Sequence, residues 1–192
     1  MISQPLLLVS GFSYVKGGRI LFQDLSFSLF SGEVIVLMGP NGSGKTTLLR
    51  CLAGIPQSFP NITKNQDLTQ SYVGHLNALK GNITVRQNLL NQTKATLEQI
   101  RKALAVRGLS SFEDRPLQTL SAGQQRQVAL SRLSLAQAKL WLVDEPTTHL
   151  DESATSQFWD VLEGHLKAGG AAVLCSHTPV PISEAKVLAL HE

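Results

Sequence analysis

Residues 39–46 read Gly-Pro-Asn-Gly-Ser-Gly-Lys-Thr and match the pattern G-x-x-x-x-G-K-[ST]. Glycines in such a loop let successive backbone N–H groups point inward at phosphate oxygens. Lys45 would reach the β- and γ-phosphates of a nucleotide, and the Thr46 hydroxyl would coordinate Mg²⁺. A glycine-rich turn without function fits poorly, because an apolar run precedes the match and a helical pattern follows it. The candidate phosphate-binding residues are therefore Gly39, Pro40, Asn41, Gly42, Ser43, Gly44, Lys45, Thr46 and Thr47.

Two acidic residues, Asp144 and Glu145, follow a second short apolar run. Open α/β sheets bind their ligands at the carboxyl ends of the strands, where these side chains are expected. Asp144 is suited to hold Mg²⁺, directly or through water, and Glu145 to activate an attacking water as a general base. Read alone, Asp-Glu-Pro is also a normal polar exit from a strand. That alternative weakens because the same chain carries Lys45 and its loop earlier in the sequence.

The elements that must position these residues follow from hydrophobic patterning. Short apolar runs predict buried strands at Val34–Met38, 140–143 and Ala171–Cys175. Further strands are predicted at 6–9, 25–29, 72–74 and 187–190, and helices at 46–53, 85–91, 96–107, 121–136 and 154–166. Strands that alternate with helices predict an α/β fold with a mostly parallel sheet covered on both faces. Residues 56–71 are the least regular stretch, and a helical insertion is predicted from about residue 56 to residue 120.

Composition limits the remaining classes. The chain has 192 residues, of which 43% are hydrophobic and 16% charged, which excludes disordered, collagen-like and coiled-coil proteins. Two cysteines far apart, Cys51 and Cys175, exclude a disulfide framework or a zinc site and favour a reducing compartment. Residues 1–110 hold 11 Lys/Arg against 4 Asp/Glu, and the rest hold 6 against 10. This asymmetry fits either a polyanionic ligand in the first half or ordinary surface drift, and composition does not choose.

A third motif indicates the family. Leu120-Ser121-Ala122-Gly123-Gln124 opens a predicted helix, with Ser121 and Gln124 as a capping box, and resembles the LSGGQ signature of ABC ATPases. The segment 148–151 resembles the D-loop of that family, and His177 resembles the switch histidine that contacts the γ-phosphate. Tyr14 resembles the aromatic residue that stacks on adenine; a tyrosine on a strand face is an equal alternative.

This resemblance implies a fold and a mechanism. The fold would be a P-loop NTPase of the ABC type, α/β, with a mostly parallel core sheet, a small antiparallel β lobe and a helical subdomain. It would form one domain over residues 1–192, with the helical subdomain inserted at about 82–136. Two copies would form a homodimer, in which the signature of one closes over ATP held by the other. ATP and Mg²⁺ are the implied cofactors; Lys45, Glu145 and His177 the catalytic residues; Thr46 and Asp144 the metal ligands; and Ser121, Gly123, Gln124 and Asp151 further nucleotide contacts.

Two features narrow the resemblance within the family. Ser121 lies only 76 positions after Lys45, which leaves no room for the long coiled coil of DNA-repair members. His75 stands where the Q-loop glutamine is usual, and it is a further candidate contact at the nucleotide site or a link to a membrane subunit. A loop histidine without either role is the alternative. With the ending Ser176-His177-Thr178-Pro179, these residues resemble the ATP-binding subunit of the cytochrome c maturation, or haem exporter, system.

That closer resemblance implies a peripheral ATPase on the cytoplasmic side of the bacterial inner membrane. Its partner would be an integral membrane subunit of the cytochrome c maturation type, and ATP use would drive a step of haem delivery. No nucleic acid is expected as a partner. No direct haem ligation is expected either, because the chain has no CxxCH. The alternatives are an ABC ATPase that serves another substrate, such as a peptide or lipid, or a nucleic-acid-associated ABC ATPase.

Overall fold

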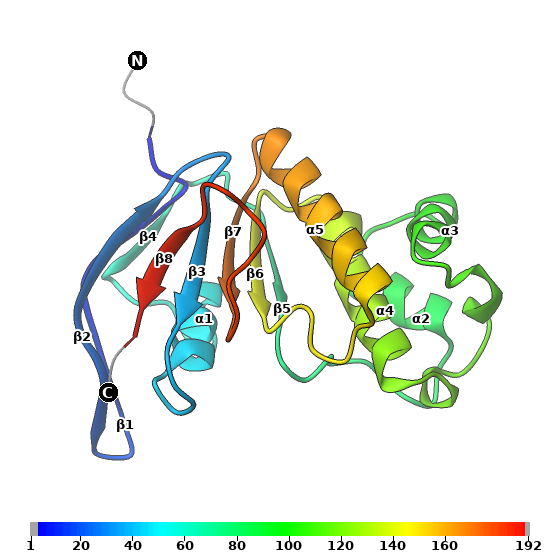
Figure 1. The fold of residues 1–192 in the computed structure, drawn as a ribbon, viewed down its shortest axis with the longest axis horizontal. Coiled ribbons are helices and arrows are strands. Elements are labelled where there is room, and N and C mark those ends of the chain that lie inside the picture. Colours follow the sequence, from blue (N-terminus) through cyan, green and yellow to red (C-terminus); the bar gives the residue numbers. More distant parts are fainter. Residues whose placement is uncertain (1–3, 191–192) are drawn as a thin grey trace.

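The computed structural model describes residues 4–190, which form two sheets and a group of helices (Figure 1). The smaller sheet is antiparallel, with the order β2-β1-β4. It consists of β1 (Leu7–Lys16), β2 (Arg19–Leu29) and β4 (Ile62–Lys64). A turn at Gly17 and Gly18 joins the first two strands, and both glycines have positive φ, 59° and 77°. The two strands run much further toward this turn than the predicted segments 6–9 and 25–29.

The larger sheet is parallel throughout, with the order β5-β6-β7-β3-β8. Its strands are β3 (Val34–Met38), β5 (Gln70–Val73), β6 (Leu140–Asp144), β7 (Ala171–Cys175) and β8 (Lys186–Ala189). Every residue of β6 and β7 is buried, as continuous apolar runs predict for strands covered on both faces. All five strands end at one edge of the sheet, and the candidate catalytic residues lie there.

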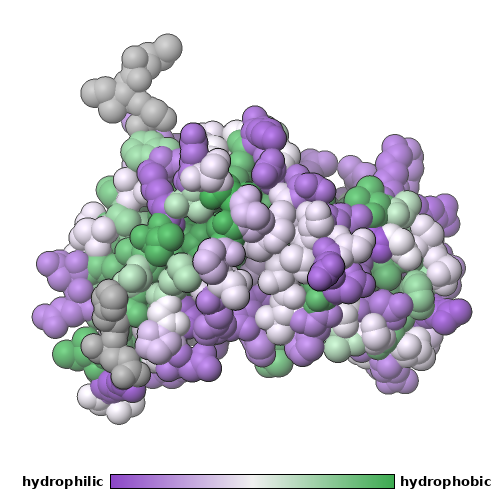
Figure 2. Space-filling view, in the orientation of Figure 1, coloured by the Kyte–Doolittle hydropathy of each residue, from purple (hydrophilic) through white to green (hydrophobic). Residues whose placement is uncertain are grey.

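The faces of the parallel sheet bury alternate residues against different partners. On one face, Ile35 and Leu37 pack with α1 (Lys45–Ala53) and with the antiparallel sheet. On the other face, Val34 and Val36 pack with α4 (Ala122–Leu135) and α5 (Glu152–Lys167). The predicted doubly covered α/β sheet is therefore confirmed. Figure 2 shows apolar side chains gathered over the side of β8 and the antiparallel sheet, whereas the far helical end is mostly polar.

The helices at the opposite end from the antiparallel sheet form their own small core (Figure 1). It joins α2 (Val85–Gln92), α3 (Leu97–Val106) and one side of α4, through Leu89, Ile100, Leu104 and Val128. Two single 3₁₀ turns, Ser110–Phe112 and Leu117–Thr119, connect α3 to α4. These helices fall within the range 82–136, and their treatment as an inserted subdomain stays a prediction.

The predicted starting point of the helical insertion was wrong. The helical insertion was predicted from about residue 56, but residues 56–73 contain β4 and β5, and helix begins only at Val85. The strand β4 pairs with β1 through Ile62 and Val9, residues far apart in the chain. Such a three-residue strand is stabilised by its partner and leaves no periodicity of its own in the sequence.

Within residues 4–190, no helix is long and apolar enough to cross a membrane.

Candidate nucleotide-binding and hydrolysis site

The glycine-rich loop joins the end of β3 to the start of α1, the context that its motif requires. Gly39 has a φ of 150°, and a Cβ there would lie 2.3 Å from the carbonyl oxygen of Leu190. Gly44 is the N-cap of α1, with a φ of 95°. Both positions need glycine, one for space and one for its left-handed backbone. The loop therefore leads directly into the N-terminus of α1, where an anion is stabilised.

Two polar side chains of this loop, Lys45 and Ser43, are buried. The Lys45 ammonium donates to the carbonyl oxygens of Gly39 at 2.7 Å and Pro40 at 2.9 Å, and the side chain is 7% exposed. Ser43 is 2% exposed, and among the residues of range 4–190 its hydroxyl has no hydrogen-bond partner. A buried hydroxyl without a partner is rare outside functional sites. A fixed cation and an unsatisfied hydroxyl at the N-terminus of a helix suit a phosphate group.

Thr46 and Asp144 meet between α1 and the end of β6. The Thr46 hydroxyl donates to Oδ2 of Asp144 at 2.8 Å, and Asp144 is 1% exposed. A hydroxyl and a carboxylate are the hard oxygen ligands that Mg²⁺ takes beside a nucleotide's phosphates. The pair fits the predicted metal site.

Glu145 is surrounded by three side chains. His177, at the exit of β7, donates from Nε2 to Oε1 at 2.7 Å, and Thr148 donates its hydroxyl to Oε2 at 3.2 Å. His75 Nδ1 lies 3.7 Å from Oε2. Burial alone would raise the pKa of Glu145, but the hydrogen bonds from His177 and Thr148, with the charges of both histidines, hold it below its usual value. The carboxylate is thus kept ionised and oriented, as a general base requires.

A hollow beside the loop brings several predicted residues together. Glu145, His177 and the glycine-rich loop line it, and the β1–β2 hairpin contributes Lys16 and Leu21, which were not predicted. No sequence signal marks these two, since only the hairpin fold carries them to the loop. The lining residues are Lys16, Leu21, Asn41, Gly42, Gly44, Lys45, Thr46, Thr47, Glu145 and His177.

Tyr14 does not line this hollow. Its ring stacks on Phe22, with centroids 5.9 Å apart, and meets Phe59 edge-on at 5.8 Å. It therefore lies in an aromatic cluster on the strand face, the position that the alternative interpretation gave it. Its predicted contact with adenine stays a prediction.

The signature residues lie away from the loop of their own chain. Ser121 is the N-cap of α4: its hydroxyl accepts from the Gln124 N–H at 3.2 Å, and the Gln124 side chain accepts from the Ser121 N–H at 2.9 Å. This confirms the predicted capping box. Asp151 caps α5, accepting from the Ala154 N–H at 2.8 Å. Ser121, Gly123, Gln124 and Asp151 are all absent from the lining of the hollow described above.

Gly123 is packed tightly against the segment resembling the D-loop. A Cβ on Gly123 would lie 2.6 Å from the carbonyl oxygen of His149, a residue with a φ of 66°. The first turn of α4 and residues 148–151 are thus in direct contact. Their relative position depends on the missing side chain at residue 123.

Arg126, one turn further along α4, is a buried residue to which no role was predicted. It is 3% exposed and donates to backbone carbonyls on both sides of the Glu145 site. A basic residue on a helix is normally exposed, so periodicity alone could not identify it.

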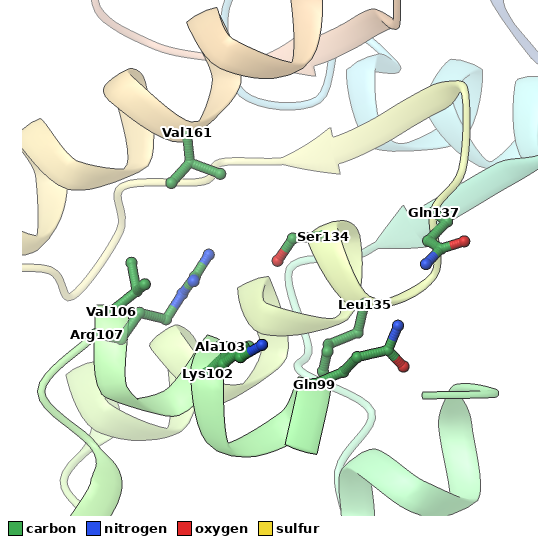
Figure 3. Close-up of a pocket in the computed structure, with 9 residues that line it drawn as sticks. All are labelled: Gln99, Lys102, Ala103, Val106, Arg107, Ser134, Leu135, Gln137 and Val161. Atoms are coloured by element: carbon green, nitrogen blue, oxygen red, sulfur yellow. The ribbon is translucent and has the colours of Figure 1, made fainter. Parts of the chain in front are cut away.

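A separate groove lies among α3, α4 and the middle of α5 (Figure 3). Arg107 and Val106 come from the end of α3, and Val161 from α5. The groove contains none of the predicted nucleotide-binding or catalytic residues. This groove is therefore distinct from the candidate site at the carboxyl edge of the parallel sheet.

Comparisons with known proteins agree with this geometry. The family model described as ABC transporter matches residues 22–148. Three relatives are named cytochrome c biogenesis ATP-binding export protein CcmA. That of Rhodobacter capsulatus is 39% identical over 96% of this chain and 87% of its own length. That of Pseudomonas putida is 41% identical over 89% of both, and that of Escherichia coli K12 is 40% identical over 88% of this chain and 87% of its own.

A solved structure shows the same fold. A protein from Pyrococcus furiosus described as an ABC transporter ATP-binding protein superimposes with a TM-score of 0.82, covering 96% of each chain, at 20% identity.

Proposed function

This chain belongs to the ABC transporter family, among the cytochrome c biogenesis ATP-binding export proteins, and we propose that its ATP hydrolysis drives a step of haem delivery to c-type cytochromes. The family makes it an ATPase. The observation that carries the mechanism is the convergence at one sheet edge of two contacts, Thr46 with Asp144 and Glu145 with His177. We assign these residues to hydrolysis of the terminal phosphate.

The residues of the site have separate roles in phosphate binding, metal binding and proton transfer. The loop amides and Lys45 bind the phosphates, and the dipole of α1 adds to this at its N-terminus. Mg²⁺, held by Thr46 and Asp144, would neutralise charge on the phosphate oxygens. Glu145 accepts a proton from the attacking water, while His177 and Thr148 keep the carboxylate in place.

We propose that two copies act together. Ser121 and Gly123 do not line the hollow beside their own loop, although the first turn of α4 exposes a helix N-terminus that suits a phosphate. A twofold dimer would place that helix end over the nucleotide of the other copy. Each ATP would then stabilise the closed pair, and hydrolysis would release it.

The relatives' name, ATP-binding export protein, supports a proposal for the partner and the location. We propose an integral membrane subunit of the cytochrome c maturation type, with this chain peripheral to it on the cytoplasmic side of the bacterial inner membrane. An export protein's ATP-binding subunit works where ATP is present, which supports that side.

The proposal is tested by complementation of a strain that lacks its own relative of this chain. The chain, expressed with the membrane subunit from its own genome, should restore haem-stained c-type cytochromes, and the Glu145→Gln variant should not. Restoration by both would contradict the role of ATP hydrolysis. Restoration by neither, with ATPase activity retained in the purified complex, would favour another substrate, such as a peptide or lipid.

A further inference from the structure

The Arg126 guanidinium joins two loops that the chain keeps far apart in sequence. Nη2 donates to the carbonyl oxygen of Asp144 at 2.6 Å and to that of Glu145 at 2.9 Å, and Nε donates to that of Pro146 at 3.4 Å. Nη1 donates to the carbonyl oxygen of Gly74 at 2.8 Å and to Oδ1 of Asn77 at 3.0 Å. Five acceptors from two segments therefore meet one planar group on α4.

The first set of contacts shapes the backbone at the end of β6. Glu145 has a φ of 48°, a left-handed conformation that a residue with a side chain adopts at a cost. Three successive carbonyls, from Asp144 to Pro146, turn toward the same cation. A conformation of this kind persists only where the surroundings hold it, and the three hydrogen bonds from Arg126 are part of those surroundings.

The second set of contacts holds the loop that carries His75. The acceptor Gly74 directly precedes His75, whose Nδ1 lies 3.7 Å from Oε2 of Glu145. His75 is 56% exposed in its side chain, so little else packs it in place. One guanidinium thus anchors the backbone on both sides of the contact between His75 and Glu145.

The choice of acceptors leaves the catalytic carboxylates available. Across residues 4–190, the hydrogen bonds of Arg126 go to four carbonyls and one amide oxygen, and to no carboxylate. The side chain of Asp144 remains directed to Thr46, and that of Glu145 to His177. A guanidinium satisfies this set because its donors form a rigid planar fork, which the single ammonium of lysine does not reproduce.

We propose that Arg126 is a positioning residue, which holds Glu145 and the loop of His75 in register with the signature helix. Because Arg126 lies one turn after Gly123 on α4, a displacement of that helix moves the backbone of Glu145 directly. The N-terminal end of the signature helix and the Glu145 carboxylate of the same chain therefore move together. The inference rests on the proposed role of Glu145 as base.

The test compares two arginines of the same helix. Arg126→Lys keeps the charge and removes the fork. Arg132→Lys is the matched control. Arg132 also contacts Asn77, since its Nη2 donates to the Asn77 carbonyl oxygen at 2.9 Å, but it makes no hydrogen bond to the end of β6. Both variants are purified with the membrane subunit, and the thermal midpoint, ATP affinity, kcat and KM are measured.

We expect Arg126→Lys to lower kcat by about 10²-fold while ATP affinity and KM change little, since a displaced catalytic group costs about that much in rate. Arg132→Lys should leave kcat nearly unchanged. In the Arg126→Lys background, His75→Ala should lower kcat less than it does alone, because the two changes disturb one contact. Equal kcat values for both lysine variants, or fully additive losses with His75→Ala, would overturn the inference.

A milder variant covers the case in which Arg126→Lys does not fold. Asn77→Ala removes one acceptor of the guanidinium and should lower kcat in the same direction, with KM kept; unchanged kcat would contradict the inference. Glu145→Gln is measured beside it. If Glu145→Gln hydrolyses ATP normally, the assignment of Glu145 as the base is wrong. If Glu145→Gln loses hydrolysis but Arg126→Lys and Asn77→Ala keep a normal kcat, only the proposed role of Arg126 is wrong.

Discussion

His177 Nε2 donates to Oε1 of Glu145 at 2.7 Å, and the two residues follow adjacent strands of the parallel sheet. The two strand ends are hydrogen-bonded as well, since the Glu145 N–H donates to the carbonyl oxygen of Cys175, two residues before His177, at 3.1 Å. The pairing of β6 with β7 thus fixes the distance between base and histidine. Residues 32 positions apart become one unit because parallel strands end at the same edge.

Glu145→Gln should nearly abolish hydrolysis and leave ATP binding intact. The amide keeps the size of the side chain but cannot accept a proton, and general-base catalysis contributes about 10²–10⁴-fold. Phosphate release measures the rate, and size exclusion with ATP and Mg²⁺ should show a stable dimer. Unchanged turnover would remove Glu145 from this role.

His177→Ala should move the acidic limb of the kcat–pH profile to higher pH. The hydrogen bond and charge of His177 lower the pKa of Glu145, so without them the carboxylate takes up a proton at a higher pH. The base then loses activity earlier as the pH falls. Thr148→Ala, which removes only the hydroxyl 3.2 Å from Oε2, should shift the limb less. Identical limbs in all three proteins would refute the assigned cause.

His75→Ala should weaken the coupling of hydrolysis to the membrane subunit more than it weakens ATP binding. Its ring touches the catalytic carboxylate from an exposed loop, whereas the phosphate-binding loop lies elsewhere. The measurements are ATP affinity and the ATPase rate with and without the membrane subunit. Equal losses of affinity and of stimulated rate would sink the idea.

Gly123→Ala should lower both stability and turnover, although alanine is normally the better helix residue. The added Cβ would lie 2.6 Å from the His149 carbonyl oxygen and force α4 away from residues 148–151. Gly164→Ala on α5 is the control, because nothing lies within 4 Å of its new Cβ. That variant should gain about 0.5–1 kcal/mol. Thermal or urea unfolding separates the two, and equal effects would show that no close contact exists.

Lys186→Ala should destabilise the chain by about 0.5 kcal/mol at neutral pH, a small figure because the lysine is half-exposed. Burial would raise the pKa of Glu33, but the bonds from Lys186 and the Phe30 N–H lower it overall. A depressed carboxyl pKa stabilises the fold above the pKa of the unfolded chain, and this is lost as the pH falls through the folded value. The difference between variant and parent should therefore fade in acid. Lys139→Ala, at an exposed residue, should show no such pH dependence.

The parallel core and the phosphate loop were predictable because their signals are local. Val34–Met38 and Ala171–Cys175 are apolar throughout, and their strands have the predicted bounds. The family that Ser121, Gly123 and His75 indicated is confirmed by the relatives, which match this chain over most of its length. Local pattern and spacing were sufficient for these features.

The remaining features depend on contacts between distant segments. Strand β4 exists through its pairing with β1, and Lys16 reaches the hollow only because the β1–β2 hairpin folds toward the loop. Arg126 is charged, so its burial follows from five acceptors that converge in three dimensions. Neither periodicity nor a motif contains that information.

The carbonyl oxygen of Leu190 packs directly against Gly39 of the phosphate-binding loop, because β8 pairs with β3 at the edge of the sheet. A strand that carries no reacting side chain is in this way a structural support for nucleotide affinity. A substitution that weakens the pairing of β8 with β3, or a bulky fusion after β8, should therefore lower the affinity for ATP before it affects other properties.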